Sequence, residues 1–197
     1  LVSLITVLLA TSYKQIGRLM FLFSLLTLIA ILKGFWQKFI GFDAIEYDAL
    51  MESGMYKTHL LPQITRYFSI FTDAGNYGSN MGFTCVLFGI TGLFSKKPGL
   101  KTYYLCVSAL SLYSMFTTGT RGAIVVPLGG LLLFALISKN IRLMSAATVG
   151  GICIYVFFAF TYAGESNYMI RRMRTAFRPN KDASYLVRKQ NRQKLAE

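Results

Sequence analysis

The residue best placed to bind a charged ligand is an arginine that stands between two long apolar runs. Arg121 lies in the sequence TGTRGA (residues 118–123), and residues 102–119 and 122–138 carry no other charge. An arginine at the centre of a membrane helix costs about 2.5–3.5 kcal/mol, so we expect Arg121 at a membrane surface, facing a polar ligand. The planar fork of its guanidinium suits a phosphate or a pyrophosphate better than a lysine point charge does.

Two further groups of cations could reach the same ligand. Arg66 opens an aromatic stretch, residues 66–78, that ends in turn-forming residues. After residue 170 the chain is strongly basic, with only Asp182 and Glu197 as acidic residues. The cations of this tail are Arg171, Arg172, Arg174, Arg178, Lys181, Arg188, Lys189, Arg192 and Lys194. An alternative interpretation of the tail is a stretch that binds lipid phosphates without any chemistry.

Other catalytic patterns are missing from the sequence. It contains no Gly-rich nucleotide loop, no paired zinc ligands and no Gly-x-Ser-x-Gly elbow, so we expect neither a metal nor a cofactor. Asp43, Glu46 and Asp48 lack the glycine and the distal glutamate of a calcium loop, so they are predicted to form a hydrated acidic surface. The three cysteines, at positions 85, 106 and 153, each lie in an apolar run and indicate no disulfide framework.

Membrane helices are the elements that must position these residues. Hydrophobic residues make up 54% of the chain and its mean hydropathy is +0.47, which is untypical of a soluble domain. The apolar runs are continuous, which favours helices over a barrel. The sequence therefore predicts an all-α, polytopic bundle over residues 1–163 and the start of a basic outer loop over 164–197. The six predicted helices span residues 1–11, 19–36, 79–94, 102–119, 121–138 and 142–163, with glycines at 82, 89, 92, 129, 130, 150 and 151 for close packing.

Basic residues in the short connections predict the orientation of the bundle. Three loops carry cations and no acidic residue beside them, namely Lys14 and Arg18, then Lys96, Lys97 and Lys101, then Lys139 and Arg142. These loops should be cytoplasmic, so the loop 37–78, the turn 118–122 and the segment after residue 163 should lie outside. Either the count is wrong by one helix and the basic tail is cytoplasmic, or the tail is an outer domain. We prefer the second interpretation because the three loops agree.

Three stretches of the sequence resemble the bacterial O-antigen ligase and O-antigen polymerase family of membrane proteins. Residues 66–78 resemble the family's arginine, aromatic stretch and Asn-containing turn before a helix, although Ala74 stands where a proline often precedes the asparagine. Residues 118–123 are similar to its Ser/Thr-Arg-Gly/Ser-Ala element, and residues 184–188 to the start of its large periplasmic loop. Together the resemblance covers about residues 60–197.

This resemblance implies a fold like that of the GT-C membrane glycosyltransferases and an inverting glycosyl transfer. The donor would be a glycan on undecaprenyl pyrophosphate, and the acceptor a hydroxyl of a lipid or a glycan, at the periplasmic face of the bacterial inner membrane. Arg66, Arg121 and Arg188 map onto the family's pyrophosphate-binding arginines, which stabilise charge on the leaving group. Ligase and polymerase remain alternatives within the family.

The family's general base is a histidine in the large periplasmic loop, and no such residue follows position 164 here. The chain starts at Leu1 inside an apolar run, so we expect a fragment that is inactive alone. Its only histidine, His59, is predicted to be a solvated or interfacial loop residue rather than a catalytic one.

A second class of function stays open, namely a polytopic transporter or flippase of anionic lipids, in which Arg66 and Arg121 would line a pathway. Such a protein should show internal repetition of its helices, which these residues do not show. Membrane lipids are expected partners. Nucleic acid is not, because the outer face gives no access to it.

Overall fold

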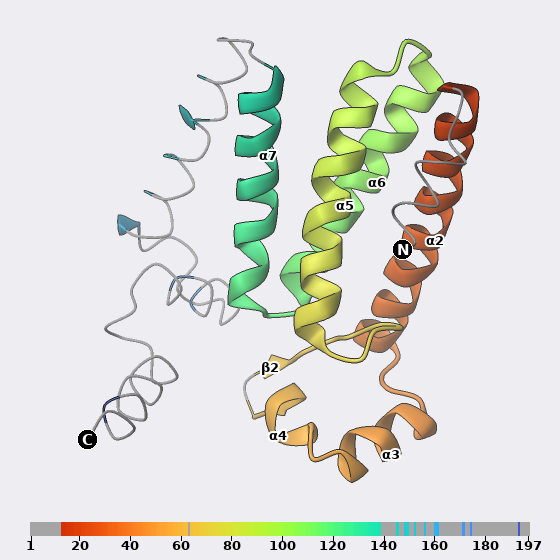
Figure 1. Cartoon of the computed structure of the whole chain (residues 1–197). Helices are drawn as coiled ribbons and strands as arrows, with labels where there is room; N and C mark the ends of the chain where they lie inside the picture. Colours follow the sequence, from red (N-terminus) through yellow and green to blue (C-terminus); the bar gives the residue numbers. More distant parts are fainter. Residues whose placement is uncertain are drawn as a thin grey trace.

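The computed structural model describes residues 13–62 and 64–138, together with isolated positions beyond residue 138. Within that part the fold is helical, apart from one pair of two-residue strands, which confirms the all-α fold class for it. The long helices run side by side in a bundle, and two short helices lie at one of its ends (Figure 1). Apart from isolated positions, the predicted helices at 1–11 and 142–163 and the segment 164–197 fall outside the described residues.

Helix α2 (Tyr13–Phe39) extends beyond both ends of its predicted span of residues 19–36. It ends where the backbone N–H groups of Ile40 and Gly41 both donate to the carbonyl of Trp36, at 2.9 and 3.2 Å. Gly41 has a φ of 118°, a conformation that glycine adopts without strain after a helix. The outer loop predicted at 37–78 is therefore shorter, since regular helix covers both of its ends.

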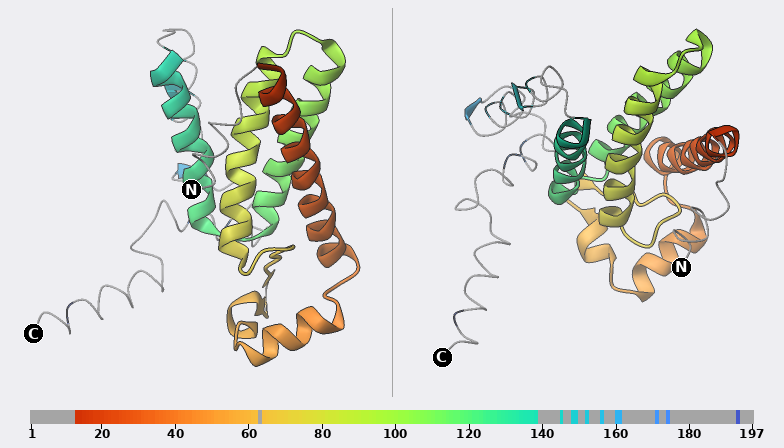
Figure 2. Two further views of the ribbon diagram at one scale, coloured as in Figure 1. Left: turned by 45° about the vertical axis from the view of Figure 1, so that its right-hand side comes forward. Right: turned by 45° about the horizontal axis from the view of Figure 1, so that its top comes forward.

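Helix α5 (Ala74–Phe94) is the central helix of the bundle (Figure 2). It begins five residues before the predicted start at 79, because the Oδ2 atom of Asp73 accepts a hydrogen bond of 2.6 Å from the Gly75 N–H and caps the helix. Hydropathy alone missed this first turn, which contains the polar Asn76. Tyr77 and Phe88 of α5 are fully buried, and the helix contacts α2, α6 and α7.

Helix α6 (Pro98–Thr117) starts with proline in its first turn and packs along α5. Small polar residues join the two helices: Thr84 donates to Ser111 at 3.2 Å, and Ser108 donates to the Cys85 carbonyl at 2.6 Å. Glycines allow this close approach. Positions 82, 89, 92 and 130 each face a neighbouring element, which confirms their predicted packing role. Among the described residues nothing lies within 4 Å of the Gly129 Cβ position, and the glycines at 150 and 151 fall outside the described residues.

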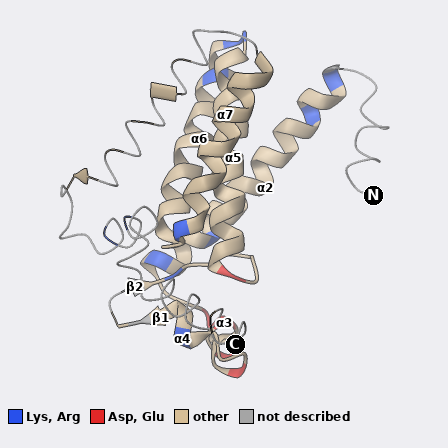
Figure 3. Cartoon of the chain, turned by 60° about the vertical axis from the view of Figure 1, so that its left-hand side comes forward, with Lys and Arg blue, Asp and Glu red and all other residues tan. Residues whose placement is uncertain are grey.

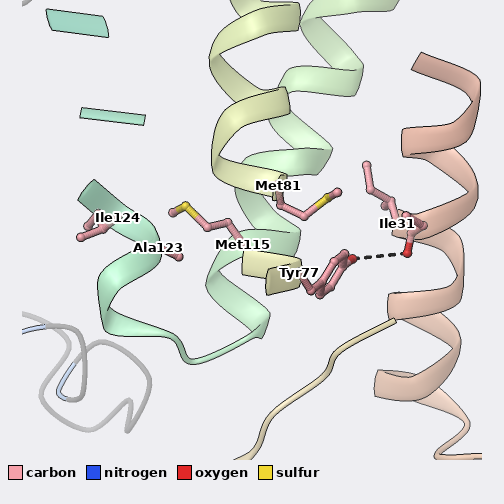
Figure 4. Close-up of a cluster of buried hydrophobic side chains, with 7 residues drawn as sticks. Ile31, Tyr77, Met81, Met115, Ala123 and Ile124 are labelled. Carbon is pink, nitrogen blue, oxygen red and sulfur yellow. Dashed lines mark hydrogen bonds between the residues drawn. The ribbon is translucent and has the colours of Figure 1, made fainter. Parts of the chain in front are cut away.

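The chain then turns and returns along α5. Gly119 has a φ of 59° in this turn, which leads into the 3₁₀-helix η1 (Arg121–Ile124) and helix α7 (Val125–Ser138). The predicted turn at 118–122 is therefore present, and the span predicted at 121–138 begins with a 3₁₀ segment. Ala123 and Ile124 of η1 join Ile31, Tyr77 and Met115 in one buried cluster (Figure 4).

The connection between α2 and α5 is structured. It contains α3 (Ala44–Glu52), α4 (Tyr56–His59) and the antiparallel strands β1 (Leu60–Leu61) and β2 (Ile64–Thr65), in which Leu60 pairs with Thr65. Residues 66–73 then lead without regular structure into α5.

Two helices of the described residues are long and apolar enough to cross a membrane, Lys14–Phe39 and Arg121–Ser138. Much of their apolar surface is exposed: Leu26 of α2 is 61% exposed and Ile137 of α7 is 70% exposed. Apolar surface of this kind is compatible with contact with lipid.

The acidic residues of the described stretches lie at one end of the bundle, whereas basic residues occur at both ends (Figure 3). The start of α2 and the connection between α5 and α6 share one end and carry Lys14, Arg18, Lys96, Lys97 and Lys101. The opposite end carries the five acidic residues of the described stretches 13–62 and 64–138, at positions 43, 46, 48, 52 and 73, together with Lys38, Lys57, Arg66 and Arg121.

Candidate functional site

Arg66 reaches across the end of the bundle to the turn that precedes Arg121. Its Nε donates to the Thr118 carbonyl at 3.2 Å, and its Nη2 donates to the Thr120 hydroxyl at 2.9 Å. A longer bond of 3.4 Å runs from Nη1 to the Thr58 carbonyl. The guanidinium is half-buried and acts as a cross-link between segments more than 50 residues apart.

Thr120 connects Arg66 with the first turn of α5 through two hydrogen bonds. Its hydroxyl accepts from Arg66 and donates to the Ala74 carbonyl at 3.1 Å, so both sides of the hydroxyl are used. The buried Thr118 closes the turn from within: its Oγ1 donates to the Met115 carbonyl at 2.8 Å and accepts from the Thr120 N–H at 3.2 Å. The side chains of Arg66, Thr118 and Thr120 thus fix the turn in place.

Gly78 lets this turn lie directly against α5. A Cβ atom at Gly78 would stand 2.7 Å from Thr118 Oγ1 and 3.0 Å from the Ala123 Cβ, closer than ordinary contact. Any side chain there would push the turn and η1 away from α5. The sequence signal for this role was a glycine one turn into an otherwise polar helix start.

Arg121 is half-buried as the first residue of η1, directly after Thr120. The neighbouring Gly122 is exposed, and among the described residues nothing lies within 4 Å of its Cβ position. The structure thus brings the predicted residues Arg66 and Arg121 to one end of the bundle, linked through Thr120. Arg188, the third predicted site residue, falls outside the described residues.

His59 is buried, and the prediction of a solvated or interfacial loop residue is wrong. Only 1% of its surface is exposed. Its Nδ1 lies 3.1 Å from the Met55 carbonyl, which can only accept, and its Nε2 lies 3.3 Å from the Ala74 N–H, which can only donate. With the Ala74 N–H donating to Nε2, the neutral imidazole carries its proton on Nδ1. Burial lowers the pKa of His59, and the nearby Arg66 charge acts in the same direction.

Asp73 connects His59 with the start of α5. While its Oδ2 caps the helix, its Oδ1 lies 3.3 Å from His59 Nε2. This carboxylate and the Met55 carbonyl favour the protonated histidine, but desolvation outweighs them, so the pKa of His59 stays below its ordinary value. The neutral histidine therefore stabilises the first turn of α5 by accepting the hydrogen bond from the Ala74 N–H.

Gln37 is a supporting residue that the sequence analysis missed. It is 2% exposed, and its Oε1 accepts from the N–H groups of Phe68 and Ser69 at 3.2 and 2.7 Å. Its Nε2 donates to Glu46 at 2.9 Å and to the Ser69 carbonyl at 3.1 Å. Ser69 has a φ of 56°, which is unfavourable for a residue with a side chain. A glutamine near the end of an apolar helix was the available signal.

Two carboxylates at the start of α3 contact a lysine of α2. Lys33 contacts the carboxylates of Asp43 and Glu46, the second at 3.0 Å. The hydrogen bond from Lys33 lowers the pKa of the exposed Asp43 carboxyl. Among the described residues no three histidine, cysteine or carboxylate side chains could hold a metal ion.

The chain matches no protein-family model, no curated protein and no solved structure. Functional interpretation therefore depends on the residues and contacts described above.

Proposed function

We propose that this chain is part of a membrane glycan transferase of the O-antigen ligase type. The observation that carries the proposal is the contact of Arg66 with Thr118 and Thr120, which joins two of the three resembling stretches next to Arg121. In the proposed reaction a polysaccharide moves from undecaprenyl pyrophosphate to an acceptor hydroxyl of a lipid or a glycan.

Arg121 is the proposed pyrophosphate ligand. A half-buried arginine beside the exposed Gly122 suits an anionic ligand such as a pyrophosphate. In the transition state negative charge grows on the leaving pyrophosphate, and a cation fixed by its backbone stabilises that charge without reorganising. Arg66 contributes positive potential to the same ligand while it holds the turn in place.

The proposed setting is the bacterial inner membrane, with the site on the periplasmic side. Both apolar helices that could span a bilayer fit this setting. Cations without acidic neighbours at the opposite end fit the cytoplasmic side. Helices α5 and α6, of 21 and 20 residues, would be about 30 Å long, close to the thickness of the hydrocarbon core. A six-helix, GT-C-like membrane domain with a separate histidine base remains part of this proposal.

The proposal is tested by Arg121→Ala in the protein as its own cell makes it. We expect the variant to be expressed and to unfold at the same temperature as the wild type. Its surface acceptor should carry no glycan, because the leaving pyrophosphate is no longer stabilised. Surface polysaccharide is measured on gels. The matched control is Lys57→Ala, which removes an exposed cation from the same end of the bundle.

Two outcomes would contradict the transferase. Unchanged surface polysaccharide in Arg121→Ala would remove the proposed role of this residue. Accumulation of the lipid-linked glycan on the cytoplasmic side would indicate a transporter, whereas a blocked transferase leaves the glycan on the outer face.

Orientation is tested by single cysteines in a background that lacks the native ones. Gly122→Cys and Lys97→Cys stand at exposed positions on opposite ends of the bundle. An impermeant thiol reagent applied from outside should label position 122 only. Labelling of position 97 alone would reverse the proposed topology.

A further inference from the structure

Four residues at the end of the bundle are joined in a closed ring of hydrogen bonds. The backbone N–H of Arg66 donates to the His59 carbonyl at 2.9 Å, and the Arg66 guanidinium donates to the Thr120 hydroxyl at 2.9 Å. That hydroxyl donates to the Ala74 carbonyl at 3.1 Å, and the Ala74 N–H donates to His59 Nε2 at 3.3 Å. The ring therefore connects α4, the start of α5 and the turn before Arg121.

One nitrogen of this ring lies between a donor and an acceptor. His59 Nε2 is 3.3 Å from the backbone nitrogen of Ala74 and 3.3 Å from Asp73 Oδ1. Without a proton, Nε2 can accept from the Ala74 N–H but has no bond to offer the carboxylate; with a proton, it can donate to the carboxylate but can no longer accept. The two partners therefore exclude each other, and the proton on Nε2 determines which of them His59 binds.

The other nitrogen of the imidazole keeps its proton in both states. The Thr58 hydroxyl donates to the Met55 carbonyl at 3.0 Å, so its oxygen can accept from His59 Nδ1, also at 3.0 Å. The Met55 carbonyl is a second acceptor, 3.1 Å from Nδ1. Because both neighbours accept, a further proton binds at Nε2.

Asp73 gives the buried imidazole a route to solvent. His59 is 1% exposed and the Phe68 ring packs against it edge to face, whereas the Asp73 side chain is 43% exposed. Burial has the largest effect on the pKa of His59 and lowers it. Of the charged groups in the described residues, Arg66 lowers this pKa as well and Asp73 raises it. Protonation is thereby displaced to a pH below about 6.5, the ordinary value of histidine.

We propose that His59 is an acid-sensitive switch in this ring. While Nε2 carries no proton, it accepts from the Ala74 N–H, and the ring holds the turn before Arg121 against α5. When Nε2 takes up a proton from solvent, its new N–H donates to Asp73 Oδ1. The Ala74 N–H then loses its acceptor and has no other within its own helix, so the first turn of α5 shifts together with the carbonyl that Thr120 binds.

The switch regulates the site that carries Arg121, so its effect on glycan transfer rests on the proposed function. The switch itself depends only on the contacts of the ring. Acid should therefore loosen the turn before Arg121 whether or not a substrate is present.

The state of His59 is measured by NMR of the full protein in detergent, with ¹⁵N-labelled histidine. The signals of His59 are identified by their absence from His59→Gln. At about pH 7.5 Nε2 should be unprotonated, and both ring nitrogens should become protonated with a midpoint below about pH 6.5. Asp73→Asn removes the carboxylate that binds the Nε2 proton and keeps an oxygen for the cap of Gly75, so it should move the midpoint to a lower pH.

Opening of the ring is measured by hydrogen exchange of residues 74–78 and 118–121. Wild type and His59→Gln are compared at the same pH, which cancels the intrinsic effect of pH on exchange. At about pH 5 these residues should exchange about tenfold faster in the wild type, because glutamine accepts from the Ala74 N–H without titrating. At about pH 7.5 the two proteins should agree. Residues 84–88, in the middle of α5, serve as the internal control and should not differ.

Equal exchange of residues 74–78 and 118–121 in both proteins at the acidic pH would overturn the switch. A protonated Nε2 at neutral pH would overturn it too, as would a midpoint that Asp73→Asn leaves unchanged. If His59→Gln does not fold, the histidine signal whose midpoint moves in Asp73→Asn identifies the same nitrogen, and the absence of such a signal would overturn the switch.

The proposed function is judged by a separate measurement, glycan transfer by the purified protein. Transfer should decrease in acid with the midpoint of His59 in the wild type, and should decrease less in His59→Gln. A switch that both measurements confirm, in a protein that transfers no glycan at any pH, would contradict the proposed function alone.

Discussion

Arg66 donates from Nη2 to the Thr120 hydroxyl at 2.9 Å, across 54 residues of sequence. This bond fixes the residue directly before Arg121 relative to the loop that leads into α5. The two arginines therefore have different roles. Arg66 holds the turn, whereas Arg121 is positioned by it. Substitutions should separate these roles.

Thr120→Val should lower both stability and glycan transfer. Valine keeps the shape of threonine but leaves Nη2 of Arg66 and the Ala74 carbonyl without the hydroxyl, which costs about 1–3 kcal/mol of unfolding free energy. Thermal unfolding in detergent measures the stability, and surface polysaccharide the activity. Thr120→Ser keeps the hydroxyl and should behave like the wild type; equal losses in both variants would show that the hydroxyl is not the cause.

Gly78→Ala should destabilise the bundle by about 1–3 kcal/mol, because the added methyl group would overlap Thr118 and Ala123. Gly129→Ala is the matched control in α7, where the same methyl group meets no atom of the described residues and should stabilise the helix by about 0.5–1 kcal/mol. Unfolding temperatures of the two variants should therefore move in opposite directions. Identical shifts would contradict the close packing at Gly78.

His59 should make stability depend on pH. Because its pKa in the folded protein lies below the ordinary value of about 6.5, the unfolded chain binds a proton first as the pH falls. The stability from the neutral histidine is fully present above pH 6.5 or so and decreases as the pH falls from there through the folded pKa. Unfolding temperatures at pH 7.5 and pH 5.5 measure the effect.

The control for that measurement is His59→Gln, whose side-chain oxygen can accept from the Ala74 N–H but does not titrate. Its unfolding temperature should fall less between the two pH values than that of the wild type. The same fall in both proteins would assign the pH dependence to other groups.

Gln37→Leu should loosen the segment before α5. The substitution removes the acceptor of two backbone N–H groups, one of them on the strained Ser69, at a cost of about 1–3 kcal/mol for a buried donor left unpaired. Hydrogen exchange at residues 66–73 should become faster. Phe39→Leu, at an exposed position on the same helix, should leave the exchange unchanged.

Apolar runs predicted where the helices of the bundle lie, because a long, continuous apolar segment forms a helix in an apolar environment. They did not predict where α5 begins, since Asp73 caps a first turn whose residues are polar and look like a loop. The predicted orientation of the helices put Arg66 and Arg121 on one face, and the structure brings their segments together. The burial of His59 and the role of Gln37 could not be predicted, because both depend on contacts with residues 15 to 32 positions away.

The order of synthesis delays the Arg66 link until the turn that contains Thr118 and Thr120 has been made. Ribosomes add about 5–20 residues per second, so Thr120 leaves the ribosome about 3–11 s after Arg66. During that interval residues 66–73 can form their hydrogen bonds to Gln37, because Gln37 has already been made. They cannot yet form the bonds to the turn at residues 118–120. The end of the bundle that carries Arg121 is therefore assembled only after α6 has been completed. In a nascent chain that stops before residue 118, Arg66 would lack its bonds to Thr118 and Thr120.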